Sequence, residues 1–276
     1  MNTTFLVPRS DIALVGDSWP GHGPTVTLLH AGVADRRGWT SVASEVSKRA
    51  TVVTYDRRGF GETLPGNEPF THVDDLIALL DHQQIETTWL VGSSAGGKLA
   101  LQAAVEMPHR IDGIVLISPA VSGAPSPRTD DLDSEMLEID KLITREEELG
   151  NIGEVNRLEV RLWLDGPREL EGRVSGAPRD LALEMNTTAL ANFVAESSER
   201  VPDMWARLAE LKMPTTVACG SLDARHIILR SQVLSTRIPN AKYVALEGMA
   251  HLPYLEDPLV VASLIGDALE DDPAVV

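Results

Sequence analysis

The chain has 276 residues, of which 43% are hydrophobic, and its 24 Lys and Arg against 41 Asp and Glu give a formal net charge of −17. This length suits one large domain, or one domain with an inserted lobe, better than two equal domains. A surface with this excess of negative charge repels phosphate backbones and anionic lipid headgroups. We therefore expect no nucleic acid and no membrane surface as a partner.

Short β-rich apolar runs alternate with helical patterns along most of the chain. The opening stretch to about Trp19 is expected to form one or two antiparallel edge strands. Buried strands are expected at residues 25–30, 51–55, 88–91, 113–118, 215–219 and 243–246, and helices at residues 73–84, 97–106, 227–236 and 259–269. This alternation predicts an α/β fold, with a mostly parallel sheet and helices on both faces.

The alternation breaks between residues 121 and 211, where helical periodicity replaces strand patterns. Apolar residues recur there at spacings of three and four. They are Leu132, Met136, Ile139 and Ile143, followed by Met185, Ala189 and Phe193. We therefore predict an all-helical cap, 121–211, inserted into a core domain formed by 1–120 and 212–276. The cap holds 10 Lys and Arg and 20 Asp and Glu, so its net charge of −10 is most of the total of −17.

A Gly-x-Ser-x-Gly pattern lies between a predicted strand and a predicted helix. Gly92, Ser94 and Gly96 occupy its fixed positions in the sequence LVGSSAGG. The pattern is typical of a nucleophile elbow, in which a sharp turn exposes the serine and the glycines let neighbouring backbone pass. Ser93 would need glycine two residues to either side, where the chain has valine and alanine. Ser94 is therefore the candidate nucleophile.

A nucleophilic serine needs a base, and the base needs an orienting carboxylate. In the elbow architecture these residues follow in the order Ser, Asp or Glu, His. His251 lies in a loop after the last predicted strand, and Asp223 in a turn after the strand before it, at the edge where open α/β sheets place their sites. His109 comes too early in the chain, and His226 opens a predicted helix. We therefore predict a triad of Ser94, Asp223 and His251.

Acyl transfer also needs backbone N–H donors for the developing oxyanion. Ala95, directly after the nucleophile, is expected to supply one donor, and the loop after an early strand the other. Gly32 is favoured as the second donor, with Val33 as the alternative. His30, Val33 and Trp163 are the candidates for the substrate pocket. His30 is expected to shape its loop through backbone hydrogen bonds, and Trp163 is either core or pocket wall.

No histidine or cysteine spacing resembles a metal site, and no phosphate-loop spacing is present, so we expect no metal and no cofactor. Cys219, the single cysteine, lies in a predicted buried strand and is expected to be inert. A lone cysteine fits a reducing compartment. The chain shows neither a basic leader followed by an apolar stretch nor an apolar run of about 18 residues. We expect a cytoplasmic protein, either monomer or homodimer.

Five ordered motifs resemble those of the α/β-hydrolase superfamily, in particular its helical-cap members that hydrolyse esters and lactones. The motifs are His30-Ala-Gly32 with Trp39 downstream, Asp56-Arg-Arg-Gly-Phe-Gly61, Gly92-Ser-Ser-Ala-Gly96, Gly220-Ser-Leu-Asp223 and Gly248-Met-Ala-His-Leu-Pro253. The resemblance extends from about residue 25 to about residue 269. The family usually has His-Gly at the oxyanion loop, whereas Ala31 intervenes here, which leaves the second donor open. Relatives that dehalogenate alkanes or open epoxides use an aspartate nucleophile, so Ser94 argues against both reactions.

The resemblance implies a serine hydrolase that cleaves carboxylic esters of small, neutral or apolar substrates through an acyl-enzyme. Alternatives are a lactonase of the 3-oxoadipate enol-lactonase type, a hydrolase of carbon–carbon bonds in ring-fission products, and a non-catalytic ligand receptor. The expected partner is a small-molecule ester or lactone. The acidic cap should disfavour substrates that carry a carboxylate, unless an arginine near Trp163 lies at the pocket. The arginines in question are Arg157, Arg161, Arg168 and Arg173.

Overall fold

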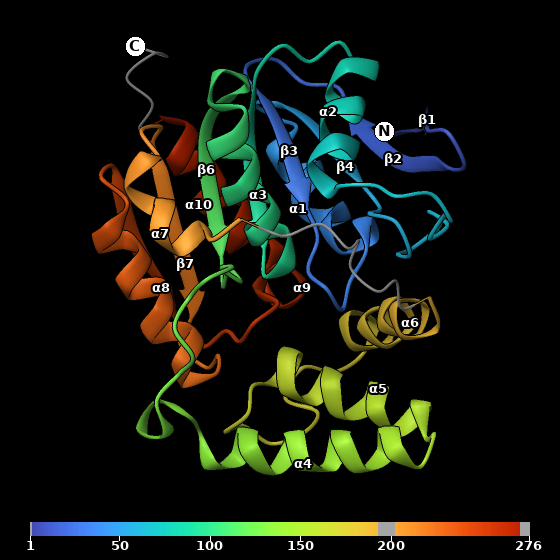
Figure 1. Cartoon of the computed structure of the whole chain (residues 1–276), viewed down its shortest axis with the longest axis vertical. Helices are drawn as coiled ribbons and strands as arrows, with labels where there is room; N and C mark the ends of the chain where they lie inside the picture. The colour runs from blue at the N-terminus through green and yellow to red at the C-terminus, as the bar shows by residue number, and fades with distance from the viewer. Residues whose placement is uncertain (1, 193–201, 271–276) are drawn as a thin grey trace.

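The computed structural model describes residues 2–192 and 202–270, which contain an eight-stranded sheet with helices on both faces (Figure 1). The strand order is β1-β2-β4-β3-β5-β6-β7-β8. The strands are β1 Thr3–Pro8, β2 Ala13–Trp19, β3 Thr25–Leu29, β4 Thr51–Tyr55, β5 Thr88–Ser93, β6 Ile111–Ile117, β7 Thr215–Gly220 and β8 Ala241–Leu246. The β1–β2 and β2–β4 pairs are antiparallel and the other neighbours are parallel. The predicted fold class is confirmed.

The central strands are buried on both faces. Every residue of β5 is buried, as expected of a parallel strand that is covered by helices on either side and therefore reads as a continuous apolar run. The edge strand β8 differs, because Leu246 is its one buried residue. The weaker apolar signal at its start explains why the sequence pattern predicts a strand from residue 243 while β8 begins at Ala241.

Seven helices in the described ranges flank the sheet. They are α1 Thr40–Val46, α2 His72–His82, α3 Ala95–Glu106, α7 Met204–Arg207, α8 Arg225–Arg237, α9 Pro253–Glu256 and α10 Pro258–Glu270. One hydrophobic cluster joins the sheet to α1, α9 and α10, and another joins it to α2, α3, α7 and α8. The sequence patterns do not predict α1, whose seven residues are too few for a clear period. No helix in the described ranges is long and apolar enough to cross a membrane.

A separate layer of helices lies beyond the carboxyl ends of the strands, at the lower end of the molecule in Figure 1. It contains α4 Ser134–Glu148, α5 Ile152–Val160, a π-helical turn Arg161–Asp165 and α6 Ala177–Ala191. We call these elements the cap helices. Residues 121–192 contain no strand, in keeping with the helical periodicity of the sequence.

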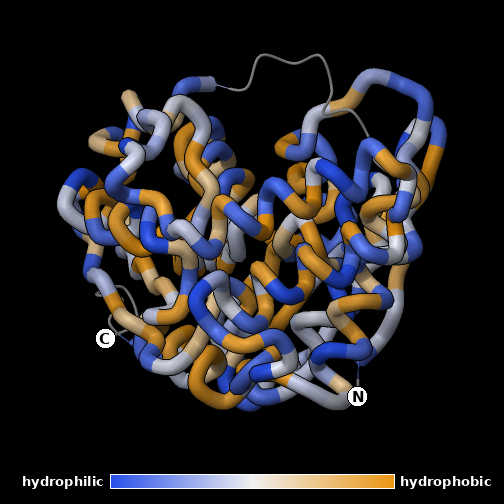
Figure 2. The backbone as a smooth tube through the Cα atoms, turned by 90° about the horizontal axis from the view of Figure 1, so that it is seen from below, coloured by the Kyte–Doolittle hydropathy of each residue, from blue (hydrophilic) through white to orange (hydrophobic). Residues whose placement is uncertain are grey.

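The apolar stripe of α4 packs on α5. Ile139, with Met136 and Ile143 beside it, contacts Leu158 and Leu162. The spacing of three and four that the sequence shows for α4 thus forms the seam between two cap helices. Figure 2, seen from the cap side, shows hydrophilic and hydrophobic residues alternating along the helices, as amphipathic segments require.

The end of the predicted cap packs elsewhere. Met204, Leu208 and Leu211 belong to the hydrophobic cluster between the sheet and α3, although they fall within the predicted limits 121–211. Phe193, the last residue of the predicted apolar period, lies outside the described residues. The limits of the cap domain therefore stay a prediction.

Candidate active site

The turn between β5 and α3 carries Ser94 in a rare backbone conformation, with φ 50° and ψ −111°. Ser93 ends β5 and is fully buried, whereas Ser94 is half-exposed. The glycines of the motif are needed for close backbone approach. A Cβ at Gly92 would lie 2.4 Å from the Gly96 carbonyl oxygen, and one at Gly96 would lie 2.2 Å from the Leu29 carbonyl oxygen. The spacing Gly-x-Ser-x-Gly therefore has a steric cause.

An Asp–His pair stands at the same edge of the sheet, in the loops after β7 and β8. His251 Nδ1 lies 2.8 Å from Asp223 Oδ2, and both side chains are buried. The second carboxylate oxygen, Oδ1, accepts the Ala224 N–H at 2.7 Å. Burial by itself would raise the pKa of Asp223, but the charge of His251 and the hydrogen bonds hold this pKa below its ordinary value. Asp223 is therefore suited to remain ionised and to orient the imidazole.

The loop after β3 lies against the start of α3. An ideal Cβ on Gly32 would sit 3.8 Å from the Ala95 Cβ, so the two predicted oxyanion donors, Gly32 and Ala95, belong to neighbouring segments. Val33 follows on the same loop and, like both of them, lines the adjacent cavity. This placement leaves both Gly32 and Val33 open as the second donor.

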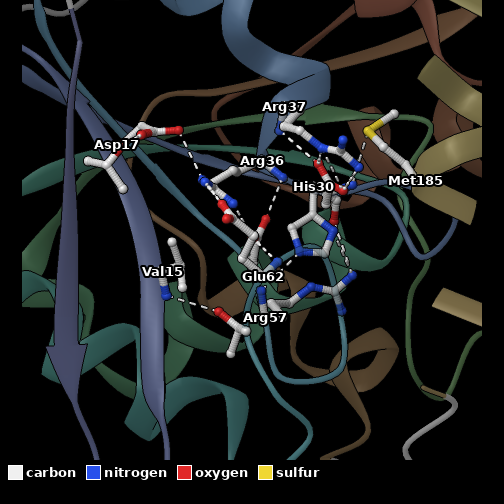
Figure 3. Close-up of polar contacts among 12 residues, drawn as sticks. Val15, Asp17, His30, Arg36, Arg37, Arg57, Glu62 and Met185 are labelled. Atoms are coloured by element: carbon white, nitrogen blue, oxygen red, sulfur yellow. Dashed lines mark hydrogen bonds and ion pairs between the residues drawn. The ribbon is translucent and has the colours of Figure 1, made fainter. Parts of the chain in front are cut away.

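His30 is hydrogen-bonded both to this loop and to Arg57 after β4 (Figure 3). Its Nδ1–H donates to the Ala31 carbonyl oxygen at 2.7 Å, and its Nε2 accepts the Arg57 N–H at 3.0 Å. The Arg57 guanidinium donates to the carbonyl oxygens of His30 and Ala31. Burial, together with the charge of Arg57, places the pKa of His30 well below its ordinary value. His30 is fully buried and is not among the residues that line the cavity, so it shapes the loop and does not face a substrate there.

The Asp56–Gly61 motif has a structural role beside this loop (Figure 3). Asp56 accepts backbone N–H groups of Arg36 at 2.8 Å and of Glu62 at 2.9 Å, and its carboxylate also pairs with the Arg36 guanidinium. A Cβ at Gly61, which has a positive φ of 51°, would lie 2.2 Å from Asp56 Oδ2. Arg36 further pairs with Asp17 on β2 at 2.9 Å. The motif therefore fixes the segment that follows the oxyanion loop.

A cavity of about 270 Å³ opens beside the proposed oxyanion donors. Its walls come from the loop after β3 and the start of α3, the loop after β4, and the cap helices. Among the residues of these walls are Gly32, Val33 and Ala95, then Arg57, Phe60 and His72, and finally Glu159, Asn186 and Leu190. The cavity therefore adjoins the turn on the side of Gly32 and Ala95, and Ser94 and His251 are not on its walls.

The sequence analysis does not predict the cavity residues from the loop after β4 or from the cap helices. Arg57 immediately follows Asp56 at the carboxyl end of β4, so the rule that sites lie at strand ends was a usable signal for it. Glu159 and Asn186 carry no such local signal, because only the packing of α5 and α6 over the sheet brings them to the cavity.

Trp163 lies beside His251 rather than in this cavity. The backbone carbonyl oxygen of Trp163 accepts the backbone N–H of His251 at 3.1 Å. The centroid of the indole ring is 4.6 Å from the centroid of the His251 imidazole. Trp163 belongs to the π-helical turn of the cap, and such turns are frequent at functional sites. His226, the other histidine near the acid in sequence, lies in α8 and makes no pair with Asp223 Oδ2.

Neither a metal cluster nor a reactive thiol is found in the described part of the chain. No group of three or more potential metal ligands occurs there. Cys219 is buried beside Asp223, with its Sγ 3.6 Å from Asp223 Oδ2. Burial and the charge of Asp223 raise the pKa of this thiol, so it stays protonated and unreactive.

Comparisons with known proteins show the family and the fold of the chain. The sequence model described as the alpha/beta hydrolase family matches residues 28–264. A putative 2-succinyl-6-hydroxy-2,4-cyclohexadiene-1-carboxylate synthase of Bacillus subtilis (strain 168) is 25% identical, over 92% of this chain and 93% of that protein. A proline iminopeptidase of Heyndrickxia coagulans is also 25% identical, over 90% of this chain and 91% of that protein. The structure of a thermophilic esterase from Thermogutta terrifontis shares the fold with a TM-score of 0.72 and 24% identity, over 98% of each chain.

Proposed function

Because the chain belongs to the alpha/beta hydrolase family, we propose that it is a serine hydrolase acting on carboxylic esters of small, neutral substrates. One observation carries this proposal. The serine of the strained turn, Ser94 at φ 50°, and the buried pair of Asp223 and His251, 2.8 Å apart, stand at the same edge of one sheet. Nucleophile, base and orienting acid are the three groups that acyl transfer by serine requires.

In the proposed mechanism His251 is the general base. Its Nδ1–H donates to Asp223 Oδ2, which leaves Nε2 to take the proton of Ser94 Oγ. The serine oxygen attacks the carbonyl carbon of the ester, and the tetrahedral intermediate expels the alcohol, which receives the proton from His251. Water then gives a proton to His251 and attacks the carbonyl carbon of the acyl-enzyme. The second tetrahedral intermediate breaks its bond to Ser94 Oγ, which takes the proton back from His251, and the carboxylic acid is released.

The oxyanion of each tetrahedral intermediate would be stabilised by the backbone N–H groups of Ala95 and Gly32, with Val33 as the alternative to Gly32. Ala95 begins α3, so its N–H also lies at the positive end of a helix. A donor of this kind contributes about 10²- to 10³-fold to kcat. Trp163 is proposed to hold the His251 loop against the cap.

The experiment that tests the proposed function is a panel of activated aryl esters of graded acyl length, together with one lactone and one carbon–carbon ring-fission substrate. We expect turnover of the short and medium neutral esters at rates far above those of the other two. Preferred turnover of the lactone or the ring-fission substrate would replace the esterase assignment. Tight binding of ligands without any turnover would favour a receptor.

The roles of the three residues are tested with an activated phosphonate and three variants. The probe should label wild type on the peptide with Ser94, and labelling should vanish in Ser94→Ala. Ser93→Ala is the matched control and should retain labelling. Asp223→Asn should keep the fold and lower kcat by up to about 10⁴, because the imidazole then takes the wrong tautomer. Label on Ser93 would overturn the assignment of the nucleophile.

A further inference from the structure

The cavity beside the oxyanion donors has an acidic side chain on its cap wall. Glu159, next to the last residue of α5, lines this cavity, and Asn186 of α6 lines it beside Glu159. The facing walls contain Ala95 and Gly32. A ligand group that fills the cavity would therefore meet the carboxyl of Glu159 while its carbonyl lies near the turn.

A network of buried amides fixes this carboxyl. Asn186 Nδ2 donates to Glu159 Oε2 at 2.7 Å and to Asn156 Oδ1 at 3.0 Å. Asn156 Nδ2 in turn donates to the Leu183 carbonyl oxygen at 2.9 Å and to Thr187 Oγ1 at 2.8 Å. Both asparagines are buried. The Asn186 amide has two hydrogens, and both are used within the network. The network therefore holds Glu159 in one place without surrounding it with donors.

Glu159 has no cationic partner among the residues that the structure describes. The nearby cap cation Arg157 pairs with Glu154 at 2.6 Å and also with Glu171. The pKa of Glu159 lies above its ordinary value. Burial is the main cause and the charge of Glu147 adds to it, whereas the hydrogen bond from Asn186 acts in the opposite direction. Among the described residues the Glu159 carboxyl receives one protein hydrogen bond, from Asn186, so its remaining acceptor positions are open to a donor on a ligand.

The rest of the cavity limits what such a ligand can be. Phe60, Phe70 and Leu190 contribute apolar surface. Arg58, which also lines the cavity, already pairs with Asp75 at 2.8 Å and with Asp11 at 2.9 Å. Arg57, the other arginine of these walls, donates to the carbonyl oxygens of His30 and Ala31, and its guanidinium lies over the Phe60 ring. The occupant that fits these walls has an apolar body and one hydrogen-bond donor at the end that meets the cap.

We propose that Glu159, held by Asn186, is a specificity residue that accepts a hydrogen bond from a hydroxyl or ammonium group of the substrate. The preferred esters then carry this donor on an otherwise apolar chain. The inference rests on the proposed esterase function and adds the substrate class to it. Glu159 has no part in the bond-breaking steps, and it acts by binding a remote group whose contribution appears in kcat/KM.

The test compares matched aryl esters of hexanoate, 6-hydroxyhexanoate and 6-aminohexanoate, and a second series with the same groups on the alcohol portion. In one of the two series, wild type should favour a donor-bearing ester over its methyl analogue by about tenfold or more in kcat/KM. Glu159→Leu should abolish this preference. Glu159→Gln should keep a preference for the hydroxyl, because its carbonyl still accepts, and should lose most of the preference for the ammonium.

Glu148→Gln is the matched control, because Glu148 is an exposed acid at the end of α4, and its ester preferences should equal those of wild type. Thermal unfolding of each variant verifies that it is folded, and hydrolysis of the hexanoate ester by Glu159→Leu shows that the triad is intact. Turnover in wild type without a donor preference in either series would overturn this inference alone, as would a preference that survives in Glu159→Leu. Absence of turnover on every ester would overturn the proposed function and this inference with it.

Discussion

The turn that presents Ser94 is held in place by hydrogen bonds from two elements. The Ser94 N–H donates to the Ile117 carbonyl oxygen on β6 at 3.0 Å, and the Ser94 carbonyl oxygen accepts N–H groups of Lys98 at 3.1 Å and Ala120 at 3.0 Å. A non-glycine residue with φ 50° and ψ −111° carries about 1–3 kcal/mol of strain, which persists only where the surroundings determine the conformation. The hydrogen bonds with the strand and the helix on either side therefore maintain the strained conformation of Ser94.

A second residue, His30, predicts a pH dependence of stability. Burial and Arg57 hold its pKa well below the ordinary value, whereas a histidine in the unfolded chain titrates near 6.5. Between these two values the unfolded state binds one more proton, so the free energy of unfolding falls as the pH drops below about 6.5. The contribution of one such group is up to about 1.4 kcal/mol per pH unit. The stability that depends on neutral His30 is fully present above about pH 6.5 and is lost progressively as the pH falls below it.

Urea unfolding at pH 7.5, 6.5 and 5.5 checks this expectation. Wild type should lose stability between pH 6.5 and 5.5, and His30→Gln should lose less over the same interval, whatever its absolute stability. His109→Gln serves as the control, since His109 is exposed, and should follow wild type. Equal losses in wild type and His30→Gln would contradict the assignment of a buried neutral His30.

At the scale of elements, the cap segment after α5 is bonded to both loops of the Asp–His pair. Trp163 accepts the His251 N–H, and Arg168 donates to the Asp223 carbonyl oxygen at 2.8 Å. Arg173 donates to the Gly248 carbonyl oxygen at 3.1 Å and pairs with Glu256 at 2.6 Å. The cap segment is thus bonded to the loops that carry Asp223 and His251, and this part of the cap is expected to move with the core.

Arg173 tests this connection. Arg173→Gln should lower the free energy of unfolding by about 1–3 kcal/mol, because it leaves the buried carboxylate of Glu256 with fewer donors. It should also lower kcat more than it changes KM, because the His251 loop loses its anchor to the cap. The measurements are thermal unfolding and steady-state kinetics on one neutral ester.

The matched control is Arg157→Gln, in a half-exposed cap arginine that pairs with Glu154 and Glu171. Pairs of this kind contribute about 0–1 kcal/mol, so Arg157→Gln should resemble wild type in both measurements. If Arg173→Gln unfolds like wild type and retains full kcat, the cap segment does not position His251.

At the scale of the whole molecule, charge is distributed unevenly. The chain has a formal net charge of −17. Three of the four cap arginines near Trp163 pair with acids, whereas the Nε of the fourth, Arg161, has no hydrogen-bond partner among the described residues. Arg157 pairs with Glu154, Arg168 with Asp133 and Arg173 with Glu256. Because these arginines are already paired with acids, they attract an anionic ligand less strongly. The net negative charge of the molecule therefore opposes the capture of an anion.

A neutral ester should therefore exceed its carboxylate-bearing match in kcat/KM, and the difference should narrow as salt is added. The reason is that exposed charges are screened over about 8 Å at physiological ionic strength. The pair of substrates is assayed at low and at high ionic strength. A preference for the anionic substrate that weakens with salt would contradict this expectation and would direct attention to Arg57, the arginine on the cavity wall beside Phe60.

Much of the fold follows from the sequence because it depends on local patterns. Buried parallel strands need continuous apolar runs, and β3 to β7 show them. The turn at Ser94 needs glycine two residues to either side, since a Cβ at Gly92 or Gly96 would meet backbone within 2.4 Å. The order Ser94, Asp223, His251 follows from the order of the strands whose ends carry these residues. These features are written in short segments and can be inferred without knowing how distant segments pack.

Features that depend on contacts between distant segments are visible only in the tertiary structure. Nothing local distinguishes Glu159 or Asn186 from other polar residues of amphipathic helices, and both reach the cavity because α5 and α6 lie over the carboxyl end of the sheet. His30 resembles a pocket residue in sequence, yet its contacts with Arg57 bury it behind the oxyanion loop. Met204 and Leu208 fall within the predicted limits of the cap but pack on the sheet. The sequence determines which residues prefer burial or a turn, whereas the partner that each side chain meets is set by long-range packing.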